Sequence, residues 1–368
     1  MKLFLCGDVM TGRGIDQILP HPGQPQLYEP YMRSAQGYVD LAEQASGPIP
    51  RPVGFDDIWG DVLAVLEREH PDARIVNLET AITAADGAWP GKSIHYRMHP
   101  DNVGCLRAAG IDCCVLANNH VLDWGYDGLR STLATLHGAG MRAAGAGTTL
   151  AAAAAPAIID AAAGSRVLVF AMGMASAGVM EDWAATRDRP GVNFLRELSQ
   201  DAVRAIARRV GGLKRVGDVV VASIHWGSNW GYGIERAQRE FAHRLIDEAR
   251  VDVVHGHSSH HPIGIEINGR RLVLYGCGDF INDYEGIRGY EVFRPDLTAA
   301  YFPSLDATGR LAALTLAPMR IDHLRVNRAT VAEARWLAQA LTRASRDFGV
   351  GIAVEGQGDD LRLVVGKR

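Results

Sequence analysis

The sequence has no apolar run long enough to cross a membrane, no excess of positive charge, and only 5 cysteines in 368 residues. A membrane span needs about 20 consecutive apolar residues, so stable membrane insertion is not expected. The net charge of −4 gives no basic footprint for nucleic acid, so no nucleic-acid partner is expected. The cysteines are odd in number and unpatterned, which predicts reduced, mostly buried thiols rather than a disulfide framework or a zinc cluster.

The amino terminus also lacks the features of a secretory signal. Met1-Lys2 is followed at once by Leu3-Phe4-Leu5 and then by Gly7-Asp8. This apolar stretch is too short for a signal core, so we interpret it as a first strand and predict a cytoplasmic protein. A chain of 368 residues with 47% hydrophobic residues fits one large α/β domain with an appendage. The sequence leaves the oligomeric state open.

Histidine is concentrated in one stretch. Residues 251–261 read VDVVHGHSSHH, in which an apolar run leads into four histidines within seven positions. The run is long enough for a short buried strand, and we expect the chain to leave the sheet at Gly256. In open α/β sheets, ligands bind at the carboxyl ends of the strands. Several imidazoles suit Zn, Mn, Fe, Ni or Cu better than Ca or Mg alone. The alternative is a histidine-rich surface turn.

Polar side chains of metal-ligand type follow the apolar runs of five predicted strands. They are Asp8, Glu79, Asn118 or Asn119, His120, His225, His255, His257 and His260. Because each follows a strand, we expect them to lie at one edge of a sheet. Carboxylates, an amide carbonyl and imidazoles are the ligand set of a two-metal site.

Other stretches predict the surroundings of this edge. Residues 20–54 are rich in proline and are interpreted as an insertion over the sheet edge, with a lid as one possible role. Asn268-Gly269 lies between two apolar runs and predicts a β-hairpin. The tail, from about residue 320, is expected to hold a helix over Val331–Ala344 and two short strands around residues 356–358.

The motifs Gly-Asp, Asn-Leu-Glu, Ala-Asn-Asn-His, His-Trp-Gly, Gly-His-x-x-His and Tyr-x-x-Gly-x-Phe occur in that order. The set resembles the CapA family, whose members are associated with poly-γ-glutamate capsule synthesis and belong to the calcineurin-like metallophosphatase superfamily. The nearest resemblance is to its signal-less branch of polyglutamine synthesis accessory proteins. It implies an αββα four-layer metallophosphatase-like sandwich over residues 1–320 and a small C-terminal α+β appendage over residues 321–368.

The resemblance also implies a metal site. It suggests two divalent ions, drawn from Mn, Zn, Fe, Mg or Ca. Glu79 stands where the superfamily has a bridging Asp, and His225 and His257 resemble the ligands of the second metal. The full set of implied metal ligands is Asp8, Glu79, Asn119, His225, His257 and His260.

Further residues are candidates for catalysis or for binding the substrate. His120 resembles the acid beside the metals, and Asp123 is its possible orienting partner; the alternative is a structural histidine capped by Asp123. Arg13 follows the first strand in a Gly-rich turn and could grip a carboxylate or phosphate, as could Lys92 and Arg97. The alternative for Arg13 is a surface residue on a simple tight turn.

Besides Glu79 in place of the bridging Asp, the chain departs from the superfamily pattern at three further points. Asp8-Val9-Met10 stands where Asp-x-His is usual, so one imidazole is missing from the first metal site. Ser258-Ser259 replaces the His-Pro common in CapA proteins, and Asp279 replaces an Asn. Asp279 and Asp283 are interpreted either as carboxylates that orient imidazoles or as turn residues. These departures weaken the expectation of ordinary phosphoesterase activity.

The function implied by the resemblance is metal-dependent hydrolysis. A metal-activated water would attack an anionic or peptide-like substrate, such as polyglutamate or polyglutamine, during polymer synthesis or modification. Two alternatives remain open. One is a metal-dependent peptide epimerase that exchanges a Cα proton. The other is a metal-stabilised, non-enzymatic accessory protein for a polymer synthase.

Overall fold

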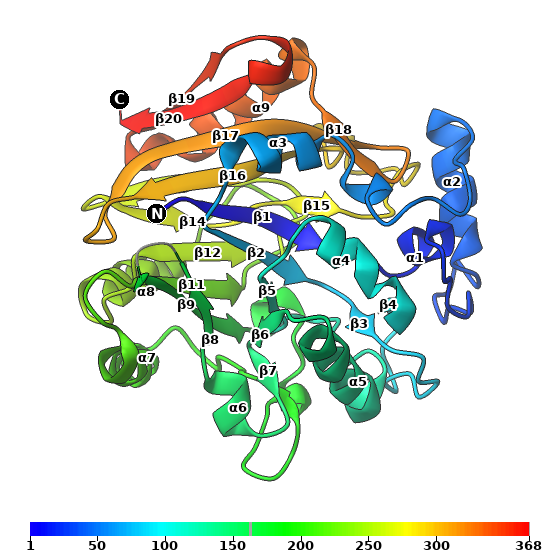
Figure 1. Ribbon diagram of the computed structural model, residues 1–368, viewed down its shortest axis with the longest axis horizontal. Helices are drawn as coiled ribbons and strands as arrows, with labels where there is room; N and C mark the ends of the chain where they lie inside the picture. Colours follow the sequence, from blue (N-terminus) through cyan, green and yellow to red (C-terminus); the bar gives the residue numbers. More distant parts are fainter. Residues whose placement is uncertain (162–163, 368) are drawn as a thin grey trace.

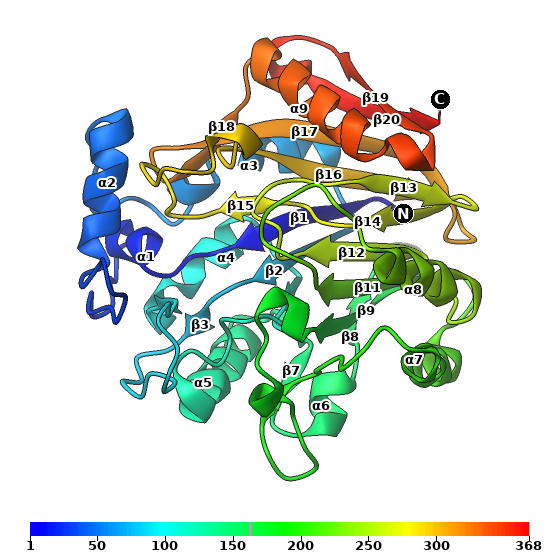
Figure 2. The ribbon, with the colours of Figure 1, turned by 180° about the vertical axis from the view of Figure 1, so that it is seen from behind.

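Two β-sheets pack face to face in the computed structural model, which describes residues 1–161 and 164–367 (Figures 1 and 2). The larger sheet contains β1 (Leu3–Val9), β2 (Ala73–Leu78), β5 (Cys113–Val115), β6 (Arg142–Ala144), β15 (Asp279–Ile281), β16 (Leu297–Leu305), β17 (Leu311–Asp322), β18 (Arg325–Arg328), β19 (Val350–Glu355) and β20 (Arg362–Lys367). The smaller sheet contains β8 (Ala157–Asp160), β9 (Arg166–Gly173), β11 (Val219–His225), β12 (Val253–His257), β13 (Ile265–Asn268) and β14 (Arg271–Leu274).

Side chains of the strands alternate between two apolar cores, as the two-residue period of a strand requires. In β1, Leu3 and Leu5 face the core between the sheets, whereas Phe4 and Cys6 face the outer side of the larger sheet. The strands of the smaller sheet behave in the same way. Both sheets are therefore covered on both faces, which explains the nearly continuous apolar runs of their strands.

Helices supply the two outer layers. The larger sheet is covered by α3 (Val62–Glu69), α4 (Gly104–Ala108) and α5 (Gly125–Gly138), and the smaller by α7 (Gln200–Leu213) and α8 (Arg236–Asp247). The others are α1 (Gly14–Ile18), α2 (Gln36–Ser46), α6 (Leu150–Ala154) and α9 (Val331–Ala344). The order helix, sheet, sheet, helix confirms the predicted αββα sandwich.

The carboxy-terminal segment continues the larger sheet. The predicted helix over Val331–Ala344 is α9, and the two predicted strands are β19 and β20. β20 pairs with β17, and α9 packs its apolar face into the core between the sheets, next to β19 (Figure 2). The predicted boundary at residue 320 falls within β17.

In the smaller sheet, one prediction is confirmed and another is wrong. The predicted hairpin is present, with Asn268 paired to Arg271 across Gly269 and Arg270. The prediction that the chain leaves the sheet at Gly256 is wrong, because β12 continues to His257. A Cβ atom at Gly256 would lie 2.3 Å from the carbonyl oxygen of Tyr275, so glycine lets the strand pass its neighbour without ending it.

Loops and short ribbons lie beyond the strand ends. β3 (Ala81–Ile82) pairs with β4 (Arg97–Met98), and β7 (Ala146–Gly147) pairs with β10 (Gly191–Val192). The proline-rich stretch over residues 20–54 contains α2, which packs beside α1 (Figure 1). Among the described residues, no helix is long and apolar enough to span a membrane. The predicted reduced cysteines are confirmed as free, buried thiols.

The strand register lines up functional side chains. In the larger sheet, Asp8 of β1 lies directly between Asn77 of β2 and Asp279 of β15. In the smaller sheet, His225 of β11 lies beside His257 of β12. All these strand pairs are parallel. Asp8 and Asn77 lie near the carboxyl ends of their strands, His225 and His257 are the last residues of theirs, and Asp279 is the first residue of β15. The register therefore brings polar side chains from distant segments next to one another within each sheet.

Gly7 should be essential for the close approach of β1 to the segment that leads into β15. A Cβ atom there would lie 1.6 Å from the carbonyl oxygen of Gly278, the residue before Asp279. We predict that Gly7→Ala lowers the free energy of unfolding by more than about 3 kcal/mol, because backbone must move apart. As the matched control, Gly211→Ala meets nothing within 4 Å in α7 and should raise the free energy of unfolding by about 0.5–1 kcal/mol. Urea unfolding followed by circular dichroism measures both, and an unchanged midpoint for Gly7→Ala would refute the explanation.

Candidate metal centre

The carboxylate of Asp8 lies at the centre of the site. It is fully buried, and its Oδ1 accepts a hydrogen bond from the Nδ2 atom of Asn77 at 2.7 Å. Its Oδ2 accepts from the backbone N–H of Ser258 at 3.2 Å. Ser258 has a φ of 103°, a left-handed conformation that is uncommon for a residue with a side chain. The loop after β12 is thus bent so that its backbone binds Asp8.

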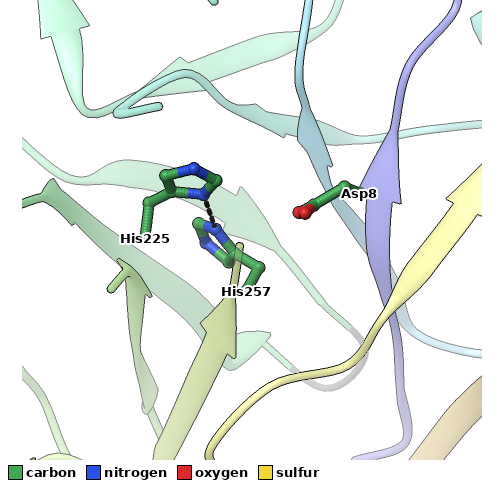
Figure 3. Close-up of side chains that lie close together, drawn as sticks. All are labelled: Asp8, His225 and His257. Carbon is green, nitrogen blue, oxygen red and sulfur yellow. Dashed lines mark hydrogen bonds between the residues drawn. The ribbon is translucent and has the colours of Figure 1, made fainter. Parts of the chain in front are cut away.

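Two imidazoles from the smaller sheet face this carboxylate (Figure 3). His225 and His257 are buried, and their Nδ1 atoms lie 2.8 Å apart. The Nε2 atom of His257 lies 2.9 Å from the hydroxyl of Ser223, which fixes the orientation of the ring. One nitrogen of each imidazole is therefore presented to the space that Asp8 also faces.

Potential ligand atoms form two groups of three. Asp8, His225 and His257 make one group, and Asp8, His260 and Asp279 make the other; within each, the ligand atoms lie within 4.8 Å of one another. Asp8 belongs to both. A carboxylate has two oxygens, so it can bind two ions at once, as the shared ligand of a two-metal site does. The superfamily resemblance instead implies Glu79 at the bridging position.

His260 and Asp279 complete the second ligand group, and both are buried. The Nδ1 atom of His260 lies 2.9 Å from Oδ1 of Asp279, and its Nε2 lies 3.0 Å from the amide nitrogen of Asn229. Asn282 donates to the other oxygen of Asp279 at 2.8 Å. Asp279 is thus placed to orient His260, as one prediction had it, and it also contributes an oxygen to the second ligand group.

Glu79 and Asn119 lie beside the same cluster. Oε1 of Glu79 is 3.8 Å from Nε2 of His120 and 4.0 Å from Nε2 of His225. The amide oxygen of Asn119 lies 2.8 Å from Nε2 of His225. The structure therefore brings together all six predicted metal ligands. Of the two Asn residues considered, Asn118 instead accepts backbone N–H bonds from the following turn, including that of His120 at 3.1 Å.

Burial of several carboxyl groups together shifts their protonation. Burial, and then the neighbouring charge of Asp279, raise the pKa of Asp8 from 3.8 to about 7. Burial and the charge of Asp8 raise the pKa of Glu79 well above its ordinary value. Without a cation, the cluster thus holds protons at neutral pH that free carboxyl groups would have lost.

Burial and neighbouring charges also give the imidazoles different pKa values. Burial lowers the pKa values of His225 and His257 well below the ordinary value, so both rings are neutral at pH 7. His260 is also buried, which opposes its charge, but Asp279 outweighs burial and raises its pKa. Neutral imidazoles are the form in which histidine binds metal.

His120 is held by the predicted partner. Its Nδ1 lies 2.6 Å from Oδ2 of Asp123, and Tyr96 donates its backbone N–H to the same oxygen at 2.7 Å. Lys92 makes an ion pair with Asp123, and its Nζ lies 3.1 Å from Nδ1 of His120. Burial, and then the charge of Lys92, lower the pKa of His120 to about 4, although Asp123 opposes this. Nε2 is left facing Glu79 and the ligand groups.

The candidate cationic residues are engaged with protein groups. Arg13 is only 3% exposed, and its guanidinium forms ion pairs with Glu29 and Asp283. It also stacks on the ring of Tyr38, at 3.8 Å from the ring centre. Arg13 is therefore buried and is not a surface residue on a tight turn. Asp283 binds Arg13 and does not orient an imidazole. The catalytic role of Arg13 stays a prediction.

Arg97 and Lys92 likewise act within the protein. Arg97 donates to the carbonyl oxygens of Ala85 at 2.8 Å and Gln24 at 3.0 Å, which ties two loops together. Lys92 reaches the His120–Asp123 pair described above. Neither side chain is free in this structure to grip a substrate without giving up these contacts.

Some residues were missed or are placed elsewhere. Asn77 belongs to the Asn-Leu-Glu motif, from which only Glu79 is predicted to have a role; its amide also contacts Glu79, at 3.2 Å, and so links two carboxyl groups. His255 turns away from the ligand groups, with Nε2 at 2.7 Å from the carbonyl oxygen of Cys6. His261 accepts the backbone N–H of Gly231 at 3.1 Å. Apart from the Asn77–Glu79 contact, these partners are distant in the sequence, so no local pattern indicates them.

The chain matches the family model described as "Bacterial capsule synthesis protein PGA_cap" over residues 2–284. It is 50% identical over 354 residues to "Probable polyglutamine synthesis accessory protein Rv0574c" of Mycobacterium tuberculosis (strain ATCC 25618 / H37Rv), covering 96% of this chain and 93% of that protein. It is also 24% identical over 332 residues to "PGA biosynthesis protein CapA" of Bacillus subtilis (strain 168), covering 88% of this chain and 75% of that protein.

Among solved structures, the chain is similar to a 5'-nucleotidase precursor from Thermus thermophilus. The TM-score is 0.43 at 12% sequence identity, and the match covers 94% of this chain. The chain spans 58% of the length of that protein.

His257→Ala should remove most of the bound metal from the purified protein. The substitution takes one imidazole from a group of three ligands, and loss of a ligand weakens a site that depends on its full set. Metal content is measured by mass spectrometry of the dialysed protein. His255→Gln is the matched control, because His255 lies on the same strand but bonds to the backbone of Cys6. Full metal content in His257→Ala would show that the ligand assignment is wrong.

The metal-free protein should be less stable at about pH 8 than at about pH 6.5. The pKa values of Asp8, Glu79 and His260 are raised by folding, so the folded protein holds protons in this interval that the unfolded chain has lost. The free energy of unfolding therefore falls as pH rises. His225 and His257 oppose this fall by only about 0.4 kcal/mol each, because in the unfolded chain about half of each imidazole is still protonated at pH 6.5 and almost none at pH 8.

Mn²⁺ should oppose this trend, because it binds the deprotonated carboxylates. We expect thermal unfolding of EDTA-treated protein to show a larger rise in Tm on adding Mn²⁺ at the higher pH. Asp8→Asn should flatten the pH dependence of the metal-free protein. An equal rise in Tm at both pH values would mean that metal does not replace protons on these carboxyl groups.

Proposed function

This chain belongs to the PGA_cap family of bacterial capsule synthesis proteins, and we propose that it is a metal-dependent hydrolase acting on an anionic or peptide-like polymer. The observation that carries the proposal is the position of Asp8 in two ligand groups. A shared carboxylate between two imidazole-containing groups is the arrangement that two-metal hydrolases use. The names of the relatives, which refer to polyglutamate or polyglutamine synthesis, support a polymer of that kind as the substrate.

The residues present fit divalent metal ions. The site offers carboxylate oxygens, an amide oxygen and three imidazoles, a mixture that favours Mn, Fe or Zn over Mg or Ca. The fit also rests on charge, because burial raises the pKa values of Asp8 and Glu79, and a bound divalent cation would hold both carboxyl groups ionised. When bound, such ions would lower the pKa of a water molecule and polarise an oxygen of the substrate.

Within this proposal the protein supplies orientation and proton transfer. Asp123 engages Nδ1 of His120, so Nε2 is the atom left to exchange a proton with the substrate. Lys92 keeps Asp123 ionised and in place. His120 is 6% exposed and Asp123 is fully buried, which limits competing water and strengthens the electrostatic interactions among these groups. The predicted cytoplasmic location stays a prediction.

The function is tested by turnover of the metal-loaded protein. The substrates are bis(p-nitrophenyl) phosphate, an oligo-γ-glutamate and an oligoglutamine, with product release measured in water and deuterium uptake at Cα measured in D₂O. Cleavage of any of them that is lost on adding EDTA supports hydrolysis. Deuterium uptake without cleavage would replace it by the peptide epimerase alternative. If the protein binds metal but shows neither cleavage nor deuterium uptake, the hydrolase proposal is wrong and the non-enzymatic accessory role is the alternative that fits.

We predict that His120 and Asn119 have separable roles. His120→Asn should keep the fold and the metal but lower the rate by about 10²–10⁴-fold, the usual contribution of one acid or base group. Asn119→Ala should instead lose metal, because its amide oxygen lies beside His225 among the ligands. Metal content and turnover are measured on both variants. If His120→Asn loses metal as fully as Asn119→Ala, then His120 is a ligand and this division is wrong.

A further inference from the structure

A groove lies between α6 and the last turns of α7, away from the ligand groups. Its volume is about 770 Å³, and it shares no residue with the metal centre. Its walls come from α6, α7 and the loop at residue 187, and its lining residues are Thr149, Leu150, Ala151, Ala154, Ala155, Pro156, Arg187, Arg208, Arg209, Gly212 and Leu213. We call it the arginine groove. Nothing in the proposed hydrolysis uses it.

The floor of the arginine groove is apolar. Alanines of α6, with Pro156 beyond them, form one side, and Leu213 at the end of α7 forms the other. Leu150 is 43% exposed and Leu213 is 38% exposed, so two large apolar side chains border the same hollow. Exposed apolar surface gathered in a concave place, rather than scattered singly, is typical of a binding site.

The charges of the groove all have one sign. Arg187, Arg208 and Arg209 are exposed and line it, and no aspartate or glutamate does. In the part of the chain that the structure describes, none of these three guanidinium groups lies within 4.0 Å of a carboxylate. Nearby arginines differ, since Arg204 pairs with Asp201 and Arg166 with Asp218. Three unpaired guanidinium groups around an apolar floor are complementary to carboxylates carried on an apolar chain.

We propose that the arginine groove binds an acidic polypeptide segment whose carboxylates pair with the three arginines and whose apolar side chains cover the floor. A nucleic acid would meet an apolar floor instead of polar groups for its sugars, on a protein whose net charge is −4. An anionic membrane surface is flat, whereas Leu150 and Leu213 border a hollow. The contact is expected to be salt-dependent, because exposed charges form it.

Binding is tested with the full-length protein and a short fluorescein-labelled peptide of repeated Glu-Glu-Leu, followed by fluorescence anisotropy. Arg208→Glu with Arg209→Glu should weaken binding by about tenfold or more, because the complementary charge is reversed. Arg204→Glu with Arg215→Glu is the matched control, since it changes net charge equally but lies outside the lining. Leu213→Ser should also weaken binding. Circular dichroism verifies that each variant is folded.

The proposal predicts binding that is lost in the groove variants and kept within about twofold in the control. Three results would overturn it. Equal weakening by both double variants would show a general charge effect. Equal binding of a peptide in which Gln replaces Glu would show that carboxylates are not recognised. Absence of peptide binding, with or without binding to vesicles of phosphatidylcholine and phosphatidylglycerol, would mean that the groove does not bind acidic peptides.

Discussion

Three carboxyl groups, those of Asp8, Glu79 and Asp279, are buried together at the ends of parallel strands, and much of the surrounding structure keeps them there. Gathering acids away from water is costly, because each disfavours ionisation of the others. The protein offsets part of this cost with the amide of Asn77 and the backbone N–H of Ser258. The rest of the cost appears as the raised pKa values of Asp8 and Glu79, and a bound divalent cation would offset it by holding both groups ionised.

Buried ion pairs hold the loops around this cluster. Arg13 joins Glu29, from the proline-rich stretch over residues 20–54, to Asp283, which follows β15 close to Asp279. Lys92 joins its loop to the His120–Asp123 pair. Removing one partner of a buried ion pair leaves an uncompensated charge, so these residues fix the loops even though the pairs add little net stability. The insertion is thus attached to the site through charge rather than lying free over the sheet edge.

The sequence allowed the αββα order to be predicted, and it also indicated six candidate ligands that the structure places close together, because a strand and the polar residue that ends it form a local pattern. Other features depend on contacts between distant segments. β15 pairs with β1, which makes Asp8 rather than Glu79 the residue common to both ligand groups. Gly256 suggested the end of a strand, but β12 continues past it, and the glycine allows the strand to lie close to the backbone of Tyr275. The burial of Arg13 could not be predicted, because its buried partner, Asp283, lies far along the chain. No periodicity encodes such pairings.

The central claim is that Asp8 is shared by two metal ions. Crystals of the Mn²⁺-loaded protein, measured by anomalous diffraction, test it directly. We predict two anomalous peaks about 3.5–4 Å apart, each within coordination distance of one oxygen of Asp8. His225 and His257 should lie at one peak, and His260 and Asp279 at the other. A single peak, or two peaks bridged by Glu79 with Asp8 bound to only one of them, would contradict the account.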